Sequence, residues 1–484
     1  MDYDVIVVGA GYGGVTCAAM LAIEGKRVLL VDKNPSAGGK VMTVRRGGYG
    51  YELWPIAGGP SEDSHFHKLA EVLGLDPEEV IIQPDIGGEY RYIRPDGSMA
   101  VAQFSARPSL HPEMAAALPE AFGATEEDMG PLMDFVNYVL TVDVDAHKEL
   151  ETEDLITGTR KFGMPAYLEA YLFVSLGVAF SAPLDKVPMS EAILTFREMV
   201  AGGGGRYGRG GYGRLAELAA EKVVECGGTV LLNTRVDEVI VEDGRAVGIR
   251  TTDGDEYRAR CVVSNAGIQP TVLKLTDTAA FPPDYVESVR ALEPSLSFVG
   301  YRYWFDEPIF TQPMVMQYSD DSWWDEERYR RAEAGEWPEH PFLFFSVPSL
   351  YDPDLAPEGG QMLMAGTLCS PDPKSPMNQT AVEIVDREMH ATFPEIDGHV
   401  VRRQAFTALH AANASRDPVV AGAGGEAIGI AQVIGQCGST KPDVRTPLGG
   451  LYIVGCDAGG IGCGTHQAVD SGFNVAEVVS ADLA

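Results

Sequence analysis

Four glycines near the N-terminus have the spacing of a dinucleotide-binding turn. Gly9, Gly11 and Gly14 match the pattern GxGxxG, and Gly13 lies within it. In such a turn the first glycine permits the tight bend, the second lets a pyrophosphate approach the backbone, and the third lets a helix pack closely on a strand. A helix that begins there offers free N–H groups and a positive dipole end to the phosphates. The glycines therefore predict a pyrophosphate site.

The segments around this turn have the order that such a site needs. Residues 4–8 indicate a buried strand, residues 15–24 a helix and residues 27–31 a second strand. Near-continuous apolar strands are typical of a parallel sheet that is covered on both faces. Asp32 ends the second strand, where a carboxylate can accept hydrogen bonds from ribose hydroxyls. Together they predict a Rossmann-like unit.

A glycine pair after Asp32 distinguishes between two dinucleotides. Gly38 and Gly39 could bring a loop back over the same phosphates, a feature that NAD folds do not need. The acid followed by Gly-Gly resembles the FAD-binding signature of the amine oxidase and phytoene desaturase superfamily, in which arginine usually follows the pair. Here Lys40 replaces that arginine, so a point charge replaces a bidentate fork. The resemblance implies non-covalent FAD, with Lys33, Gly39 and Lys40 among its contacts.

A second motif near the C-terminus resembles the other flavin segment of this superfamily. Residues 446–457 indicate a turn, a buried strand and an acid, and a glycine-rich loop then leads into a helix over residues 466–479. The resemblance implies that Asp457 binds the ribityl chain of the flavin. The positive end of the helix would stabilise the negative charge of reduced flavin. Contacts from the helix start are expected from Gly464, Thr465, His466 and Gln467.

The middle of the chain contributes to the same fold. A helix is predicted over residues 215–226, followed by strand-like runs over residues 229–232, 236–241 and 246–251. In the superfamily the backbone at the position of Val236 contacts the adenine. The resemblance therefore implies that this segment belongs with the two termini.

The expected fold class is α/β, with a discontinuous Rossmann-like FAD-binding domain and an interleaved α+β substrate domain. The FAD-binding domain is expected to contain residues 1–65, 210–285 and 440–484, and the substrate domain residues 66–209 and 286–439. The first part of the substrate domain is expected to be mostly helical, and the second part to contain strands.

Charge and cysteine usage exclude several kinds of partner. The net charge of −33 would repel a phosphate backbone, so nucleic acid is not an expected partner. The seven cysteines form an odd number, with no CxxC pair and no His/Cys spacing typical of metal ligands. This usage favours a reducing, cytoplasmic location and predicts no metal site.

One apolar stretch approaches the length that crosses a bilayer. It covers residues 164–184, but Pro165, Glu169 and Pro183 interrupt it, so a full span is not expected. We expect first a buried helix and second a segment that dips into a membrane surface. The second interpretation would give the protein peripheral membrane contact.

The resemblance also implies a class of reaction. The superfamily members similar to this chain are mostly carotenoid desaturases, isomerases and retinol saturases, which act at carbon–carbon bonds. A flavin supplies hydride transfer at N5, so the protein need only orient the bond and exclude competitors. We expect a small hydrophobic organic substrate with an alkene-type bond. No second GxGxxG follows a strand, so a dedicated NAD domain is not expected.

Three side chains are candidates for the substrate end. Trp54 lies where relatives usually have Asp and Gly before proline, and it either narrows the substrate pocket or packs in the core. His466 and His410 are candidate catalytic groups because histidine exchanges protons near neutral pH. A structural role is the commoner one for such a histidine.

Three other functions stay open at this point. An amine oxidase would oxidise a carbon–nitrogen bond, and a reduced-flavin isomerase or hydratase would show no net redox change. A protein that kept the fold and lost the chemistry would bind flavin or a partner. The electron donor or acceptor, the direction of reaction and the oligomeric state also stay open.

Overall fold

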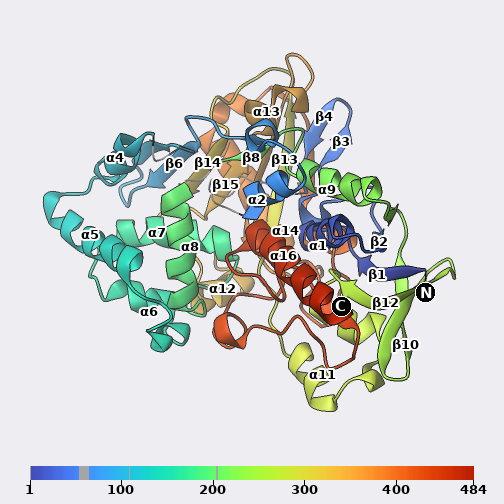
Figure 1. Ribbon diagram of the computed structural model, residues 1–484. Coiled ribbons are helices and arrows are strands. Elements are labelled where there is room, and N and C mark those ends of the chain that lie inside the picture. Colours follow the sequence, from blue (N-terminus) through green and yellow to red (C-terminus); the bar gives the residue numbers. More distant parts are fainter. Residues whose placement is uncertain (1, 54–64, 108–109, 203–204) are drawn as a thin grey trace.

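The computed structural model describes residues 2–53, 65–107, 110–202 and 205–484. Two seven-stranded sheets and a layer of helices make up most of the described chain. Figure 1 shows the helical layer at the left, the first sheet at the right and the second sheet above the centre. Blue, yellow-green and red segments meet in the first sheet and its helices, so widely separated parts of the chain build this unit.

The first sheet is mainly parallel. Its strands, in order, are β10 (Val236–Glu242), β11 (Arg245–Thr251), β12 (Glu256–Ser264), β1 (Tyr3–Val8), β2 (Val28–Val31) and β9 (Thr229–Leu231), and β18 (Leu451–Ile453) pairs with β12. The strands β9, β2, β1, β12 and β18 run parallel, whereas β10 and β11 form an antiparallel extension. All residues of β2 and β18 are buried, as expected for a parallel sheet covered on both faces.

The carboxyl ends of four parallel strands meet at one edge of this sheet. Val8 pairs with Val31 on one side and with Ser264 on the other, and Ser264 also pairs with Ile453. The residues that follow these strands therefore lie close together. Ligands of open α/β sheets bind at such an edge.

Two helices begin at the same edge because they follow these strands. Beside the sheet, α1 (Tyr12–Ile23) packs against α16 (Gly464–Leu483) and α9 (Arg214–Glu225). The contact between α1 and α16 is close, since a Cβ on Gly472 would lie 2.5 Å from the Cβ of Thr16. This arrangement confirms the predicted α/β, Rossmann-like fold.

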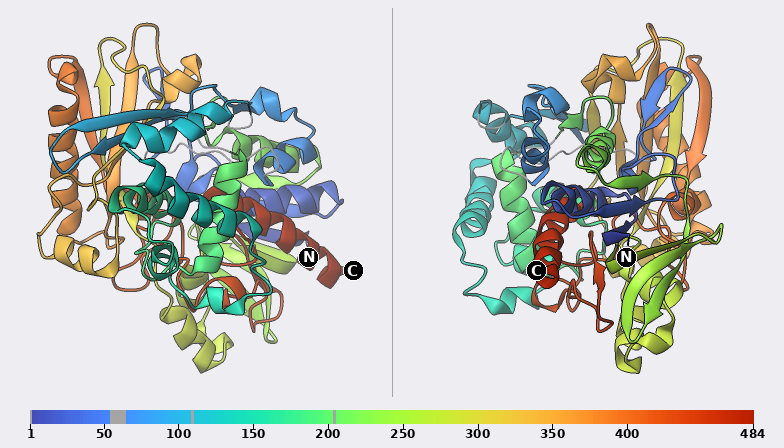
Figure 2. Two further views of the ribbon diagram at one scale, coloured as in Figure 1. Left: turned by 90° about the vertical axis from the view of Figure 1, so that its left-hand side faces the viewer. Right: turned by 45° about the vertical axis from the view of Figure 1, so that its right-hand side comes forward.

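The second sheet packs against the helical layer with one face. Its strands, in order, are β17 (Val400–Phe406), β13 (Ser297–Phe305), β16 (Gln361–Cys369), β15 (Leu343–Ser346), β14 (Met314–Tyr318), β6 (Gly88–Ile93) and β7 (Met99–Phe104). Only the pairing of β14 with β6 is parallel among these described strands. On its outer face lies α14 (Met377–Thr392), visible in orange in the left view of Figure 2.

Five helices form the layer beside the inner face of the second sheet, in which α4 and α7 contact the strands and α8 packs against α5, α6 and α7. They are α4 (Pro112–Phe122), α5 (Glu126–Thr141), α6 (Leu155–Arg160), α7 (Ala166–Phe180) and α8 (Met189–Gly202). They share one hydrophobic core with the sheet, which includes Phe135, Phe173, Phe180 and Phe298. The β6–β7 hairpin lies in the part of the chain expected to be mostly helical, and it completes the sheet by pairing with β14. The domain boundaries stay a prediction.

The apolar stretch over residues 164–184 contains α7, which is buried on most of its surface. The first of its two interpretations, a buried helix, is therefore the observed one. Among the helices of the described residues, none has both the length and the apolar character that a bilayer crossing requires.

The shorter elements are β3 (Val44–Arg46), β4 (Tyr49–Tyr51), α2 (His65–Val72), α3 (Pro77–Val80), β5 (Ile81–Ile82), β8 (Tyr207–Gly208), α10 (Ile268–Pro270), α11 (Pro283–Arg290), α12 (Glu326–Glu333), α13 (Pro348–Tyr351) and α15 (Ala408–Ala414).

Candidate active site

A cavity of about 900 Å³ begins at the carboxyl edge of the first sheet and extends under the helical layer. We call the part between the two glycine-rich motifs the cofactor arm, lined by Gly9, Asp32, Lys40, Val236, Asn265 and Asp457. We call the part between the second sheet and the helices the apolar arm, lined by Tyr90, Tyr171, Leu172, Leu176, Phe298 and Met316.

Most of the residues predicted to contact a cofactor lie together in this cavity. Its lining includes Gly9, Gly11, Gly13, Asp32, Lys33, Gly39, Lys40, Val236, Asp457, Gly464, Thr465 and His466. Two predicted contacts are not among the lining residues. Gly14 packs under the turn, where a Cβ would overlap the carbonyl oxygen of Gly9. Gln467 is buried within α16, with 1% of its surface exposed.

The N-terminal turn has the geometry expected of its glycines. Gly9 has φ +98°, a value that L side chains rarely adopt, so the tight bend requires glycine. Gly11 is the N-cap of α1 and no side chain caps that end of the helix. The first N–H groups of α1 therefore carry no side-chain cap at the cofactor arm, where an anion can bind them.

One end of the cofactor arm carries the first acid. Asp32 accepts hydrogen bonds from the backbone N–H of Ala10 at 2.6 Å and of Asn34 at 2.7 Å. Burial raises the pKa of this carboxyl group above its ordinary value. Lys33 forms an ion pair with Asp417 at 3.6 Å, so its ammonium is held beside the arm by a carboxylate that sequence analysis did not single out.

Lys40 has a different environment from the one that its position in the motif suggests. Its Nζ donates a hydrogen bond to the carbonyl oxygen of Ile428 at 2.6 Å. Burial lowers the pKa of Lys40 to about 8. Lys40 thus lines the arm while a backbone carbonyl binds its ammonium group. An arginine at this position could instead bind a phosphate through two parallel hydrogen bonds.

The other end of the cofactor arm carries Asp457. This carboxylate is 1% exposed and accepts hydrogen bonds from the N–H groups of Ile268 and Ile430 and from the guanidinium of Arg416. Arg416 lines the arm too, although nothing in the sequence pattern pointed to it. It lies in an irregular segment with no periodicity or motif, so only the tertiary structure reveals it.

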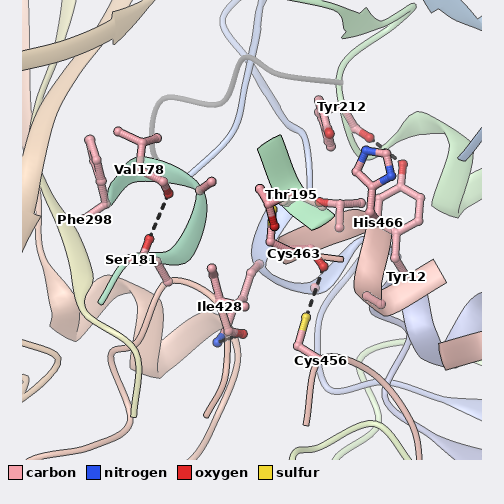
Figure 3. Close-up of a pocket in the computed structure, with 18 of the residues that line it drawn as sticks. Tyr12, Val178, Ser181, Thr195, Tyr212, Phe298, Ile428, Cys456, Cys463 and His466 are labelled. Carbon is pink, nitrogen blue, oxygen red and sulfur yellow. Dashed lines mark hydrogen bonds between the residues drawn. The ribbon is translucent and has the colours of Figure 1, made fainter. Parts of the chain in front are cut away.

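The start of α16 borders the junction of the two arms. Cys463 is the N-cap of this helix and makes no side-chain capping bond. Figure 3 shows His466 beside Tyr12 and Tyr212, with Thr195 close by and Phe298 across the cavity. Burial, with smaller contributions from His65 and Arg206, lowers the pKa of His466 to about 3. The imidazole of His466 is therefore neutral near pH 7.

The other two substrate-end candidates have different outcomes. His410 is exposed, does not belong to the cavity lining, and accepts a hydrogen bond from the N–H of Thr407 at its Nδ1, which caps the start of α15. The structure therefore corrects the expectation that His410 lies at the flavin site, because its side chain turns back to its own helix terminus. Trp54 lies outside the described residues.

The apolar arm contains few polar groups. Tyr90 and Ser175 are hydrogen-bonded to each other at 3.1 Å. Glu198, on α8, is the one carboxyl group in the described cavity lining outside the cofactor arm. Its Oε1 lies 3.4 Å from the position of a Cβ on Gly462, and burial raises the pKa of Glu198. No hydrogen bond or ion pair to Glu198 exists within the described part of the chain. No motif or spacing in the sequence pointed to Glu198.

Comparison with known proteins identifies the family. The family described as flavin containing amine oxidoreductase matches residues 12–480. The chain belongs to this family. It is a flavin-dependent oxidoreductase, and the expected relationship to carotenoid desaturases, isomerases and retinol saturases is confirmed.

The relatives of this family member carry names from that group. Prolycopene isomerase of Daucus carota is 24% identical over 100% of this chain and 80% of its own length. Phytoene desaturase (neurosporene-forming) of Cereibacter sphaeroides is 26% identical over 74% of this chain and 72% of its own. All-trans-retinol 13,14-reductase of Homo sapiens is 25% identical over 75% of this chain and 65% of its own.

Solved structures show the same fold. An oxidoreductase from Methanosarcina mazei matches with a TM-score of 0.70 and 20% identity, covering 98% of this chain and 100% of its own. Putrescine oxidase bound to putrescine matches with a TM-score of 0.68 and 14% identity, covering 100% of this chain and 99% of its own. At these identities the likeness concerns the fold alone.

The flavin of the family fits the residues of the cofactor arm. Two helix N-termini without side-chain caps, those of α1 and α16, border it. Asp32 and Asp457 provide carboxylates at its two ends. These groups suit a long ligand with an anionic centre and hydroxyl groups on either side.

Proposed function

We propose that the protein binds FAD non-covalently and adds or removes hydrogen across a carbon–carbon bond of a hydrophobic alkene-type substrate. The observation that carries this proposal is the continuity of the cavity, which runs from both cofactor motifs into the apolar arm. A substrate in the apolar arm would contact the flavin end of the cofactor at the junction of the two arms, beside the start of α16.

The cofactor arm supports FAD in particular because one end suits an adenosine and the other suits a ribityl chain. Asp32 and Val236 line the first, and Asp457 lines the second. The glycine turn and the uncapped N–H groups at the start of α1 lie between these two ends of the arm. Cys456 lines the arm, but its thiol donates a hydrogen bond to the carbonyl oxygen of Gly464. We therefore propose that FAD binds without a covalent bond to this cysteine.

The apolar arm supports a hydrophobic substrate. Leu172, Leu176 and Phe298 line it, and a polar substrate would lose hydration there without gaining partners. The relatives are named for prolycopene, phytoene and retinol, which are alkenes of low polarity.

Hydrogen addition across a double bond needs one hydride and one proton, and hydrogen removal releases both. When bound, reduced FAD would supply the hydride for hydrogen addition, and oxidised FAD would accept it for hydrogen removal. We assign the proton to Glu198, which lies on the substrate side of the cavity beside Gly462. Its raised pKa keeps a larger protonated fraction near neutral pH than an ordinary carboxyl group has. The neutral His466 is suited to hydrogen bonding instead.

One observation favours a second function, amine oxidation. A carboxylate in an apolar arm can pair with an ammonium group, and Glu198 holds that position. A third candidate is isomerisation with reduced flavin and no net redox change, supported by the relative named prolycopene isomerase.

The visible spectrum of the purified protein, followed by identification of the flavin released by heat, tests the cofactor. FAD in the supernatant supports the proposal, and a colourless protein that takes up no added FAD refutes it. Anaerobic mixing then separates the reactions. Reoxidation of the reduced protein by an alkene, or bleaching of the oxidised protein by its saturated partner, supports carbon–carbon chemistry. Bleaching by amines alone supports the second function, and isomer formation with catalytic reductant supports the third.

A further inference from the structure

Two backbone amides hold the carboxylate of Asp457 in the cavity wall. The N–H of Ile268 donates to its Oδ2 at 2.8 Å, and the N–H of Ile430 donates to its Oδ1 at 3.0 Å. Each of these amides directly follows a glycine, Gly267 in one case and Gly429 in the other. The two donors come from segments far apart in the sequence, and each holds one oxygen of the carboxylate.

The glycines leave the space that the charged groups occupy. A Cβ on Gly429 would overlap Oδ1 of Asp457. A Cβ on Gly267 would lie 2.5 Å from Cζ of Arg416, and the φ of +91° at Gly267 also disfavours any other residue. The backbone is thus shaped around an aspartate and an arginine together.

Arg416 links two buried carboxylates. Its Nη2 donates to Oδ2 of Asp457 at 2.5 Å, and its Nε lies 3.0 Å from Oε1 of Glu426. The other oxygen of Glu426 accepts a hydrogen bond from the N–H of Gly424 at 2.7 Å. The side chains of Arg416, Glu426 and Asp457 are 9%, 0% and 1% exposed.

Such a triad is a poor device for stability alone. Removing charges from water costs several kcal/mol per ion, and a packed apolar cluster often stabilises a fold as well or better. The triad forms part of the wall of the cofactor arm, because Arg416 and Asp457 both line the cavity. Its net charge of one negative unit resides beside the position expected for the ribityl hydroxyls.

We propose that Arg416 is a positioning residue for the cofactor: it holds Asp457 in place as an anionic acceptor for the ribityl hydroxyls of FAD. Glu426 pairs with the single positive charge of Arg416, so the three side chains together keep one negative unit in the wall. The inference rests on the proposed binding of FAD.

The electrostatics agree with this geometry. Burial alone would raise the pKa of Asp457, but Arg416, the two backbone donors and the ammonium of Lys40 together outweigh it, so the pKa lies below the ordinary value. Removing the guanidinium takes away the largest of the contributions that lower this pKa, so the carboxyl group should protonate at a higher pH than in wild type.

The test is the dissociation constant for FAD, measured by quenching of flavin fluorescence on titration of deflavinated protein between pH 5 and pH 8. We expect wild type to bind with little change over this range. We expect Arg416→Met to bind about tenfold more weakly at pH 7 and to weaken further towards pH 5, with partial rescue by Arg416→Lys. The control is Arg445→Met, which removes a comparable arginine–aspartate pair with Asp482 at the surface and should bind like wild type.

A double-mutant cycle separates action through Asp457 from a general structural role. In an Asp457→Asn background, Arg416→Met should weaken FAD binding by less than twofold further. If Arg416→Met does not fold, Arg416→Met/Glu426→Gln removes the guanidinium with its neutralising carboxylate and takes its place in the titration. Wild-type affinity and pH dependence in the folded variant, or additive losses in the cycle, would overturn the inference alone. Wild-type protein that binds no FAD would overturn the proposed function, and this inference with it.

Discussion

The side-chain amide of Asn265 lies directly against Gly455, where a Cβ would come within 2.5 Å of it. With the side-chain oxygen of Asn265 assigned to the side of Gly11, it accepts a hydrogen bond from the N–H of Gly11 at 3.2 Å, and the side-chain nitrogen donates to the carbonyl oxygen of Val454 at 3.1 Å. One side chain at the end of β12 therefore joins the start of α1 to the end of β18. It connects the two cofactor motifs.

Asn265→Ala should lower the free energy of unfolding by about 2 kcal/mol, because it leaves a backbone N–H and a backbone carbonyl without their partner. Urea unfolding followed by circular dichroism measures this change. Asn137→Ala, on the exposed side of α5, is the control and should cost less than about 0.5 kcal/mol. Equal stability of the two variants would contradict the bridging role of Asn265.

Gly11→Val and Asp32→Ala should each give folded protein with much less bound flavin. A Cβ at Gly11 already lies 2.7 Å from the Asn265 amide, and a valine would also fill the phosphate approach. Asp32→Ala removes the acceptor at the adenosine end. The absorbance ratio of flavin to protein measures occupancy, and Gly177→Ala, where a Cβ meets nothing within 4 Å, is the control. Unchanged occupancy in both variants would refute the assigned geometry.

The affinity for FAD should fall as the pH rises through about 8. The pKa of Lys40 is about 8 in the free protein, and its ammonium faces Arg416, Glu426, Cys456 and Asp457. An anionic ligand binds better to the protonated lysine, so the stabilising charge is present below that pH and is lost above it.

Equilibrium titration with FAD between pH 7 and pH 9.5 measures this effect, and we expect a loss of several-fold. Lys40→Arg keeps its charge throughout and should bind with a flat profile over the same range. An identical decline in Lys40→Arg and wild type would assign the titration to another group.

Glu198→Gln should abolish one limb of the pH–rate profile while flavin occupancy stays at the wild-type level. For hydrogen addition the carboxyl group must be protonated, so the wild-type rate should fall as the pH rises through its raised pKa. For hydrogen removal the carboxylate is the active form, so the rate should fall as the pH decreases through the same value. Stopped-flow flavin spectra with the alkene identified in the screen give the rates. A variant with the wild-type profile would exclude Glu198 as the proton carrier.

Ala179→Phe should raise KM for a hydrophobic substrate about tenfold or more without loss of FAD. Ala179 lies on α7 in the lining of the cavity, and a phenyl ring there would occupy volume in the apolar arm. Steady-state kinetics and the flavin spectrum measure the two quantities. Gly177→Ala, on the same helix and outside the cavity lining, serves as the control. Parallel loss of flavin and activity would show that the ring disturbs the fold rather than the arm.

The sequence by itself predicted most of the residues that line the cofactor arm of the cavity. Gly9, Gly11 and Asp32 could be recognised because a pyrophosphate turn places requirements on consecutive residues, such as positive φ and the absence of a Cβ. The same holds for Asp457, which ends a short buried strand before a glycine-rich loop. Local backbone geometry and the order of strands and helices restrict which residues occur at these positions in the sequence. The α/β fold class could therefore be predicted from them.

Only the tertiary structure decided which other side chains join the site. Asn265, Arg416 and Glu198 come from separate segments, and their roles depend on contacts across the sheet edge and the cavity that have no fixed spacing along the chain. His410 shows the converse, since a histidine near the C-terminal motif in sequence caps its own helix instead. The reason is physical: a motif constrains the backbone around itself, whereas a cavity wall depends on where distant elements pack.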